Sequence, residues 1–169
     1  RDVTSSRATQ PDIPHGLRLL VLDVDGVLTD GRLYFGPDGE ELKVFHVRDG
    51  HGIKSVMRAG LEVCVISGRR SAAVERRCRE LGIRHVRQGV EDKSAALREI
   101  LAETGRTPEQ TACVGDDTPD LPVMALVALP VAVADAHPDV LAAARYVTRA
   151  AGGRGAVREV CDLLVEAAQ

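Results

Sequence analysis

Short apolar runs alternate along the chain with segments of helical pattern. The runs cover residues 19–22, 63–66, 112–114 and 131–133, and a further strand-like segment covers residues 84–87. Continuous apolar runs of this length are typical of strands that are buried on both faces of a sheet. Helical patterns cover residues 52–59, 71–81, 93–104 and 156–167. This alternation predicts an α/β fold, a Rossmann-like parallel sheet with helices on both faces.

One segment departs from the alternation. Residues 33–35 and 42–45 are strand-like and flank the turn sequence Gly36-Pro37-Asp38-Gly39, which predicts a small β-hairpin. The hairpin contains Tyr34, Phe35 and Phe45, three of the four aromatic residues in the chain. We therefore expect it to pack against another surface rather than to project into solvent.

The composition indicates one globular domain and argues against two classes of partner. Apolar residues make up 44% of the 169 residues, which is enough for one packed core. A net charge of −3 and an aromatic content of 2% provide neither a basic surface nor stacking platforms for a nucleic acid. No apolar stretch approaches the ~20 residues that span a bilayer. We expect no nucleic-acid partner and no membrane partner.

A single domain is expected to cover residues 16–169, after a flexible polar arm at residues 1–15. The arm lacks the apolar segment of a signal peptide. Cys64, Cys78, Cys113 and Cys161 form no C-x-x-C pair. Free thiols in a domain with a large apolar core fit a cytoplasmic location.

Candidate catalytic residues follow the predicted strands, and open α/β sheets bind their ligands beyond these carboxyl ends of the strands. Asp23 and Asp25 follow the first apolar run, and Gly115-Asp116-Asp117 follows the third. Between them in the sequence, Ser67-Gly68 follows the second run and Lys93 begins a helix. We expect these side chains to meet at one rim of the sheet.

Such a set suits phosphoryl transfer. A phosphate monoester is a dianion, so carboxylates alone would repel it. Mg²⁺ prefers oxygen ligands and would reverse the local charge if Asp23 and Asp116 held it. Asp23 could then attack phosphorus, while Asp25 could protonate the leaving oxygen and later activate water. The groups expected to hold the phosphate oxygens are Ser67, Gly68 and Lys93.

Each of these motifs also has an ordinary structural explanation. An Asp-x-Asp sequence is commonly a turn or a pair of helix caps, and Ser67-Gly68 could be only a tight turn. Asp116 and Asp117 could cap the next helix, and a lone lysine such as Lys93 is commonly solvated. The occurrence of all four motifs in one order, each at a strand end or helix start, favours the catalytic interpretation.

In that order, the four motifs resemble those of the haloacid dehalogenase superfamily. More narrowly, the chain is similar to the 3-deoxy-D-manno-octulosonate 8-phosphate phosphatases of lipopolysaccharide synthesis. The narrower similarity rests on residues 23–31, 47–53 and 151–159, which read DVDGVLTDG, VRDGHGI and AGGRGAVRE. It extends over roughly residues 17–165 of the chain.

The resemblance implies a cytoplasmic, magnesium-dependent phosphatase that hydrolyses 3-deoxy-D-manno-octulosonate 8-phosphate through an aspartyl-phosphate intermediate. It implies a metal site made by Asp23, Asp25 and Asp116, with Asp117 and Asp120 around it. The residues that it implies at the substrate are His46, Val47, Arg48, Asp49, Gly50, Lys54, Arg69 and Arg77. Relatives commonly carry Asn at position 46, and many have a longer tail that reaches a neighbouring active site.

Three alternatives stay open. Phosphatases for the 9-phosphates of nine-carbon, sialic-acid-type sugars are similar, but they tend to carry Glu where this chain has Arg69. A related assembly domain fused to sialic-acid cytidylyltransferases is non-catalytic, and it would be expected to have lost residues that are all present here. A phosphate-accepting receiver domain carries its Asp on a later strand and lacks the Asp-x-Asp sequence.

The spacing of the motifs also bears on assembly. The superfamily usually covers its active site with an inserted cap domain. The segments between Asp25 and Ser67 and between Lys93 and Asp116 are too short for one, and the first holds only the hairpin. An open site would admit water and weaken its electrostatic interactions. We therefore expect a homotetramer, as in the family, in which the hairpin packs against neighbours and helps to close their sites.

Overall fold

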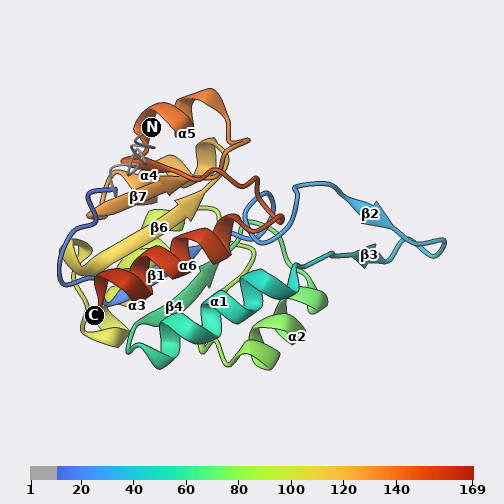
Figure 1. Ribbon diagram of the computed structural model, residues 1–169. Helices are drawn as coiled ribbons and strands as arrows, with labels where there is room; N and C mark the ends of the chain where they lie inside the picture. Colours follow the sequence, from blue (N-terminus) through green and yellow to red (C-terminus); the bar gives the residue numbers. More distant parts are fainter. Residues whose placement is uncertain (1–10) are drawn as a thin grey trace, which may run out of the picture.

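A six-stranded parallel sheet forms the centre of the computed structural model, which describes residues 11–169 (Figure 1). The strand order is β5-β4-β1-β6-β7-β8, and every neighbouring pair is parallel. The strands are β1 (Leu19–Leu22), β4 (Glu62–Ile66), β5 (His85–Arg87), β6 (Thr111–Gly115), β7 (Leu129–Ala132) and β8 (Tyr146–Val147). β1 is buried along its whole length and pairs with β4 on one side and β6 on the other. The predicted parallel sheet is confirmed.

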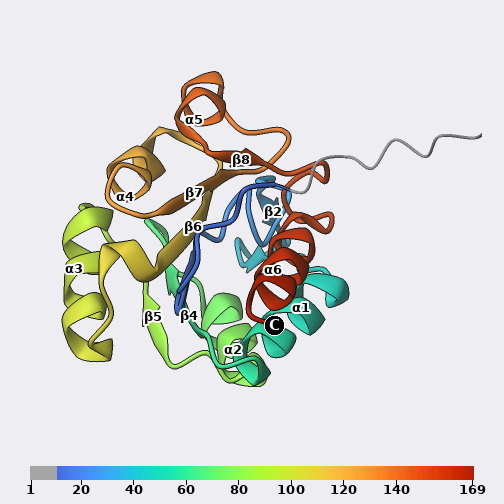
Figure 2. The same ribbon diagram turned by 60° about the vertical axis from the view of Figure 1, so that its left-hand side comes forward.

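Helices cover both faces of the sheet, as the alternation predicts (Figure 2). One face carries α1 (Val47–Arg58), α2 (Ala72–Leu81) and α6 (Ala156–Ala167). The other face carries α3 (Lys93–Thr104), α4 (Leu121–Met124) and α5 (Pro138–Ala143). Two 3₁₀ turns, η1 (Pro108–Gln110) and η2 (Thr118–Asp120), flank β6. The sheet and both helical layers enclose a core made mainly of Leu, Val, Ile and Ala, in which all four cysteines are buried as free thiols.

α1 begins at Val47, five residues before the helix that the sequence predicts. His46 caps it, because its Nδ1 accepts a hydrogen bond from the backbone N of Arg48 at 3.1 Å. Glycine weakens the helical pattern here, but Gly52 is where α1 meets α6. A Cβ at position 52 would lie 3.0 Å from the Cβ of Cys161. Close packing between the two helices therefore outweighs the low helix propensity of glycine.

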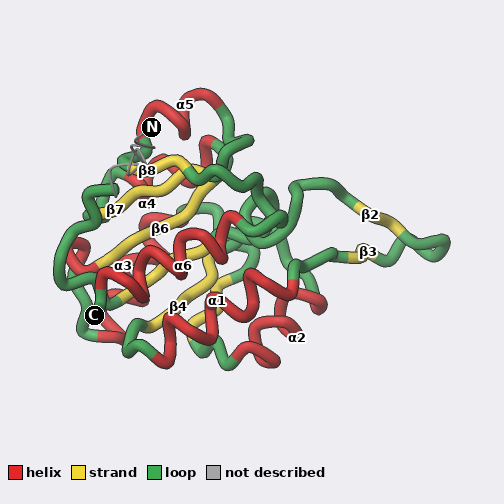
Figure 3. Tube along the Cα trace, in the orientation of Figure 1, coloured by secondary structure: helices red, strands yellow, loops and turns green. Residues whose placement is uncertain are grey.

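The hairpin projects from the body of the chain beyond the carboxyl ends of the strands (Figure 1). Its strands, β2 (Tyr34–Phe35) and β3 (Glu41–Leu42), are antiparallel and short, and most of the segment is loop (Figure 3). Phe45 at its base is half-buried against the core, whereas Phe35 is 61% exposed. The surface that we expected to pack on the hairpin is therefore not supplied by this chain over residues 11–169.

Residues 11–169 contain no cap domain. The segment between Asp25 and Ser67 forms the hairpin, α1 and β4, and the segment between Lys93 and Asp116 forms α3, η1 and β6. None of the helices in these residues is long and apolar enough to cross a membrane.

The expected flexible arm lies largely outside the described residues, which begin at position 11. In its described part, Ile13 packs against the core, and Asp12 accepts a hydrogen bond from Arg145 at 2.8 Å. The boundary at residue 16 stays a prediction.

Candidate active site

The loops after β1, β4 and β6 bring the predicted residues to one rim of the sheet. Asp23 follows β1, Ser67 follows β4 and Asp116 follows β6, and these three strands are neighbours. Lys93, the first residue of α3, reaches the same rim, where its Nζ lies 3.1 Å from Asp23 Oδ2. Parallel strands that end at one edge thus assemble groups that are far apart in the sequence.

Three carboxylates gather around this lysine. Asp23, Asp116 and Asp120 each offer an oxygen within 4.8 Å of the others. Asp120 Oδ1 accepts a hydrogen bond from Lys93 Nζ at 2.8 Å. Its Oδ2 accepts from the backbone N atoms of Asp116 and Asp117 at 3.0 and 3.4 Å. Asp120 therefore fixes both the lysine and the loop that carries Asp116, while the exposed Asp117 carboxylate caps η2.

Burial and crowding act against ionisation of Asp23 and Asp116. Burial raises the pKa of Asp23 well above its usual value, and the Asp120 carboxylate raises it further while Lys93 opposes the rise. Burial, and then Asp120, raise the pKa of Asp116 to about 7. Burial lowers the pKa of Lys93, but the Asp23 and Asp120 carboxylates more than offset this and raise it. Because one ammonium faces three carboxylates, the oxygen-rich set fits a hard divalent cation such as Mg²⁺.

Glycines allow the backbone to pack closely around Asp116. Gly26 has a φ of +85°, and a Cβ there would lie 1.8 Å from Asp116 Oδ2. A Cβ at Gly152 would lie 1.7 Å from the carbonyl oxygen of Gly26. The backbone N of Gly153 donates to the carbonyl oxygen of Val27 at 2.9 Å. The signature at residues 151–159 thus supports the loop that carries Asp23.

Ser67 and Gly68 lie at the end of β4, as predicted. The Ser67 side chain is buried, and its Oγ accepts a hydrogen bond from the backbone N of Arg69 at 3.4 Å. A Cβ at Gly68 would meet only the carbonyl oxygen of Val90, at 3.6 Å. The backbone of Gly68 therefore borders open space at the rim, where an anion can approach closely.

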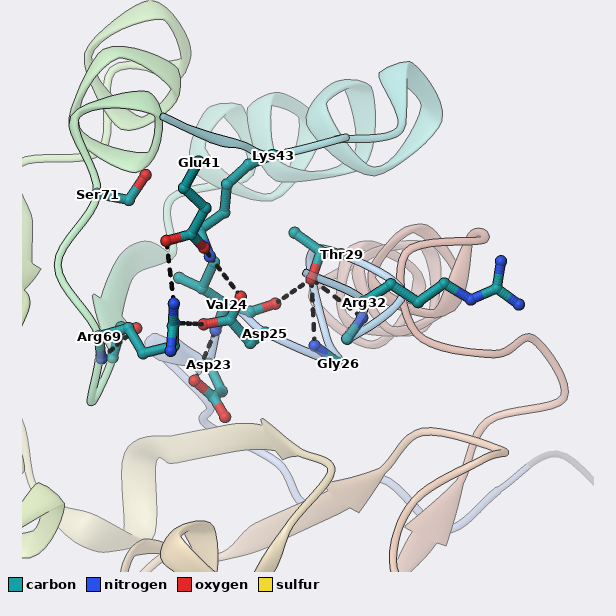
Figure 4. A network of polar contacts seen from close by, with 12 residues as sticks. Asp23, Val24, Asp25, Gly26, Thr29, Arg32, Glu41, Lys43, Arg69 and Ser71 are labelled. Atoms are coloured by element: carbon teal, nitrogen blue, oxygen red, sulfur yellow. Dashed lines mark hydrogen bonds and ion pairs between the residues drawn. The ribbon is translucent and has the colours of Figure 1, made fainter. Parts of the chain in front are cut away.

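The Asp25 side chain points toward Lys43 of the hairpin and toward Arg69 (Figure 4). Its Oδ1 accepts a hydrogen bond from Lys43 Nζ at 2.6 Å, and its Oδ2 lies 4.0 Å from Arg69 Nε. Lys43 also contacts Glu41 Oε1 at 2.6 Å, and Glu41 Oε2 accepts from Arg69 Nη2 at 3.0 Å. The resemblance implies Asp25 as a metal ligand, but its carboxylate does not lie among the clustered carboxylates around Asp23.

Glu41 and Lys43 are site residues that sequence reasoning missed. Their side chains are 18% and 3% exposed, whereas Leu42 and Val44 beside them are 56% and 58% exposed. The alternation of polar and apolar residues is visible in the sequence. Its direction, with charged side chains inward and apolar side chains outward, is the reverse of what a solvent-exposed hairpin on a single chain would show.

The predicted substrate-contact residues at the start of α1 fall into two groups. Val47, Arg48 and Lys54 are exposed. Asp49 and Gly50 are buried.

Asp49 and Gly50 serve the packing of helices. Asp49 is 1% exposed, and its Oδ1 accepts from the backbone N of Arg158 at 2.9 Å, in the first turn of α6. A Cβ at Gly50 would lie 2.3 Å from Arg77 Nη2, so glycine makes room for that guanidinium. The structure therefore brings Arg77 near the start of α1 but does not expose Asp49 to a ligand.

A cavity of about 360 Å³ opens beside the hairpin base, next to the starts of α1 and α2. Its lining consists of Lys43, Phe45, Val47, Ala73, Arg76, Arg77 and Glu80. Lys43 therefore contacts Asp25 and also borders this cavity. Arg76 and Arg77 both pair with Glu80, at 3.1 and 3.6 Å, so the two arginines leave an excess of one positive charge there, which suits an anionic group.

Comparisons with known proteins agree with this geometry. The model of the haloacid dehalogenase-like hydrolase family matches residues 86–159. The 3-deoxy-D-manno-octulosonate 8-phosphate phosphatase of Escherichia coli strain K12 is 56% identical to this chain over 149 residues. The matched part covers 88% of this chain and 79% of that relative.

Solved structures of such phosphatases share the fold. The one from Yersinia pestis is 55% identical, with a TM-score of 0.88, and the match covers 90% of this chain and 82% of that one. The one from Moraxella catarrhalis, solved with magnesium ion, phosphate ion and KDO, is 39% identical. Its TM-score is also 0.88, and the match covers 90% of this chain and 87% of that one. The chain therefore belongs to the 3-deoxy-D-manno-octulosonate 8-phosphate phosphatase family of haloacid dehalogenase-like hydrolases.

Proposed function

We propose that this chain hydrolyses 3-deoxy-D-manno-octulosonate 8-phosphate to 3-deoxy-D-manno-octulosonate and phosphate, with Mg²⁺ and an aspartyl-phosphate intermediate. The observation that carries the proposal is the position of Asp23, next to Lys93 and within the carboxylate cluster. It occurs in a chain that is 56% identical to a phosphatase named for this substrate. The proposal includes the cytoplasmic location and the role in lipopolysaccharide precursor synthesis that the family implies.

Asp23 and Asp116 are the carboxylates that would hold Mg²⁺. Asp120 is less available, because it already accepts hydrogen bonds from Lys93 and from two backbone N–H groups. Bound there, Mg²⁺ supplies the positive charge that offsets the phosphate dianion and favours the ionised forms of its two ligands.

Asp23 and Asp25 would then divide the chemistry between them. A carboxylate oxygen of Asp23 attacks phosphorus, the bond from phosphorus to the sugar oxygen breaks, and that oxygen takes a proton from Asp25. Asp25, now ionised, takes a proton from a water molecule whose oxygen attacks phosphorus. The bond between phosphorus and Asp23 breaks, which releases phosphate and restores Asp23. Lys93, Ser67 and the backbone of Gly68 would hold the non-bridging oxygens.

Arg69 is the candidate partner for the substrate carboxylate. The substrate carries a carboxylate at one end and a phosphate at the other, so its site needs cations at two places. Arg69 lies at the rim directly after Ser67-Gly68 and already holds a carboxylate, that of Glu41, at 3.0 Å. An arginine matches a carboxylate with two parallel hydrogen bonds, so the substrate could replace Glu41 there. Arg77 lines the adjoining cavity.

The outer face of the hairpin supports a homotetramer. Large apolar side chains are exposed along and beside it, namely Leu33, Phe35, Leu42, Val44 and Val47. An exposed apolar patch of this kind marks an interaction surface. Because the chain has no cap domain over residues 11–169, a neighbouring chain packed on this face would help to close the site.

The identity of the substrate predicts a specificity that depends on Arg69. The chain should release phosphate from the eight-carbon 8-phosphate with a higher kcat/KM than from a nine-carbon 9-phosphate, and EDTA should abolish both reactions. Arg69→Ala should lose about 2–5 kcal/mol of binding to the transition state, at least about 30-fold in kcat/KM on the 8-phosphate. The control variant Arg70→Ala, which removes the neighbouring exposed cation, should keep the wild-type kcat/KM on the 8-phosphate. A preference for the 9-phosphate, or an Arg69→Ala variant with the wild-type kcat/KM on the 8-phosphate, would refute the assignment of the eight-carbon substrate.

The proposed assembly predicts a mass of four chains in solution. Light scattering coupled to size-exclusion chromatography should show this mass for the wild type. Phe35→Lys, which places a charge on the apolar face, should dissociate the tetramer and reduce activity without unfolding the chain. The control variant Val147→Lys places the same charge at an exposed apolar position on β8, and it should keep the mass and activity of the wild type. A wild-type chain that is fully active as a monomer would contradict the proposal.

The carboxylate cluster predicts opposite pH effects without and with Mg²⁺. The pKa of Asp116 is raised from 3.8 to about 7, so the folded metal-free chain keeps a proton that the unfolded chain has lost. Its free energy of unfolding should therefore fall as the pH rises through this range. Mg²⁺ binds deprotonated ligands, so its stabilising effect should grow over the same range.

Thermal unfolding with EDTA or with MgCl₂, at about pH 5.5 and about pH 8, measures both effects. Asp116→Asn should flatten both pH dependences, because the titrating ligand is gone. A shift in Tm on adding Mg²⁺ that is equal at the two pH values would count against the cluster as the metal site.

A further inference from the structure

The side chain of Lys43 is only 3% exposed, although it lies on a hairpin that projects from the body of the chain (Figure 1). Its Nζ lies 2.6 Å from Asp25 Oδ1 and 2.6 Å from Glu41 Oε1 (Figure 4). A buried ammonium is costly unless it is paired and hydrogen-bonded. The two carboxylates therefore hold Lys43 in place, and Lys43 in turn restrains them.

The two carboxylate oxygens of Asp25 have different surroundings. Oδ1 receives the hydrogen bond from Lys43. Oδ2 lies 4.0 Å from Arg69 Nε, which is beyond the range of a hydrogen bond. Among the described residues, therefore, no hydrogen bond from a side chain holds Oδ2, and this oxygen can face a reacting group.

We infer that Lys43 is a positioning residue, which holds Oδ1 of Asp25 so that Oδ2 faces the oxygen of the leaving group. The inference rests on the proposed phosphatase activity. Oδ2 gives its proton to the sugar oxygen as the bond from phosphorus to that oxygen breaks. Oδ2 later takes a proton from the attacking water. Both transfers need the same orientation of the carboxyl group, since proton transfer requires hydrogen-bond reach.

Glu41 extends the same restraint. Its Oε1 contacts Lys43 and its Oε2 accepts from Arg69 at 3.0 Å, so one hairpin carboxylate links both cations that face Asp25. When a substrate carboxylate takes the place of Glu41 at Arg69, the contact between Lys43 and Asp25 does not have to change. Lys43 can therefore keep Asp25 oriented throughout turnover.

The dependence of the rate on the leaving group separates positioning of a proton donor from other roles. A sugar oxygen leaves poorly unless it is protonated, whereas p-nitrophenolate leaves readily without a proton. General acid catalysis contributes roughly 10²–10⁴-fold where it is needed. A variant that misplaces Asp25 should therefore form the aspartyl phosphate slowly from the sugar phosphate but at nearly the wild-type rate from p-nitrophenyl phosphate. Hydrolysis of the aspartyl phosphate needs Asp25 as the base with either ester, so only the first step separates the two esters.

Lys43→Met keeps the length of the side chain and removes its charge. We expect the first turnover of 3-deoxy-D-manno-octulosonate 8-phosphate, measured by rapid quench as release of the sugar, to slow by at least about tenfold. On p-nitrophenyl phosphate, the pre-steady-state burst of p-nitrophenolate should slow by no more than about threefold, with little change in the KM of either ester. Lys43→Arg should recover part of the lost rate, because it keeps a cationic donor. Arg98→Met, which removes an exposed cation from the middle of α3, should behave as the wild type.

Two results would overturn the inference. Equal losses on both esters in this first step would indicate a general structural defect, and a rise in KM with an unchanged first-turnover rate would place Lys43 in substrate binding only. A wild-type chain that releases no phosphate from either ester with Mg²⁺ would instead refute the proposed function, so the two failures are distinguishable.

Discussion

The crowding of three carboxylates around one buried ammonium is the constraint on which the rest of the site depends. Asp23 and Asp116 meet because neighbouring parallel strands end at one edge, and η2 folds Asp120 back onto the same loop. Such crowding costs free energy in the metal-free chain, because burial and like charges disfavour ionisation. Lys93 offsets only part of that cost, so a dication such as Mg²⁺ would be needed to balance the remaining negative charge before a phosphate dianion could bind. Gly26 and Gly152 permit the close approach that the arrangement needs.

Much of the fold could be predicted because buried parallel strands are uninterrupted apolar runs in the sequence. The run at residues 19–22 matches β1, and residues 93–104 match α3. The first residues of α1 were not predicted, because Gly50 weakens the helical pattern before Gly52; glycine at position 50 leaves room for Arg77 in the folded chain. β8 was missed as well, because a two-residue strand is defined only by its pairing with β7.

The site was predictable where topology alone places a residue, as for Asp23, Ser67 and Asp116. It was not predictable where the folding of the hairpin determines which side chains reach the site. Lys43 meets Asp25 only because the hairpin base turns its charged side chains toward the rim and its apolar side chains outward. One hairpin thereby presents a polar face to the site and an exposed apolar face on its other side, where the proposed neighbouring chain would pack. Such a segment can link assembly to catalysis without contributing a cap domain.

The most direct test of the central claim, that Asp23 takes up the phosphoryl group, is to identify the phosphorylated side chain. Borohydride reduces an acyl phosphate to an alcohol, so turnover stopped with borohydride should convert the phosphorylated aspartate into homoserine. Peptide mass spectrometry should then find homoserine at position 23, and only when Mg²⁺ and 3-deoxy-D-manno-octulosonate 8-phosphate are both present. Homoserine at another aspartate such as Asp25, or none anywhere during active turnover, would contradict this account.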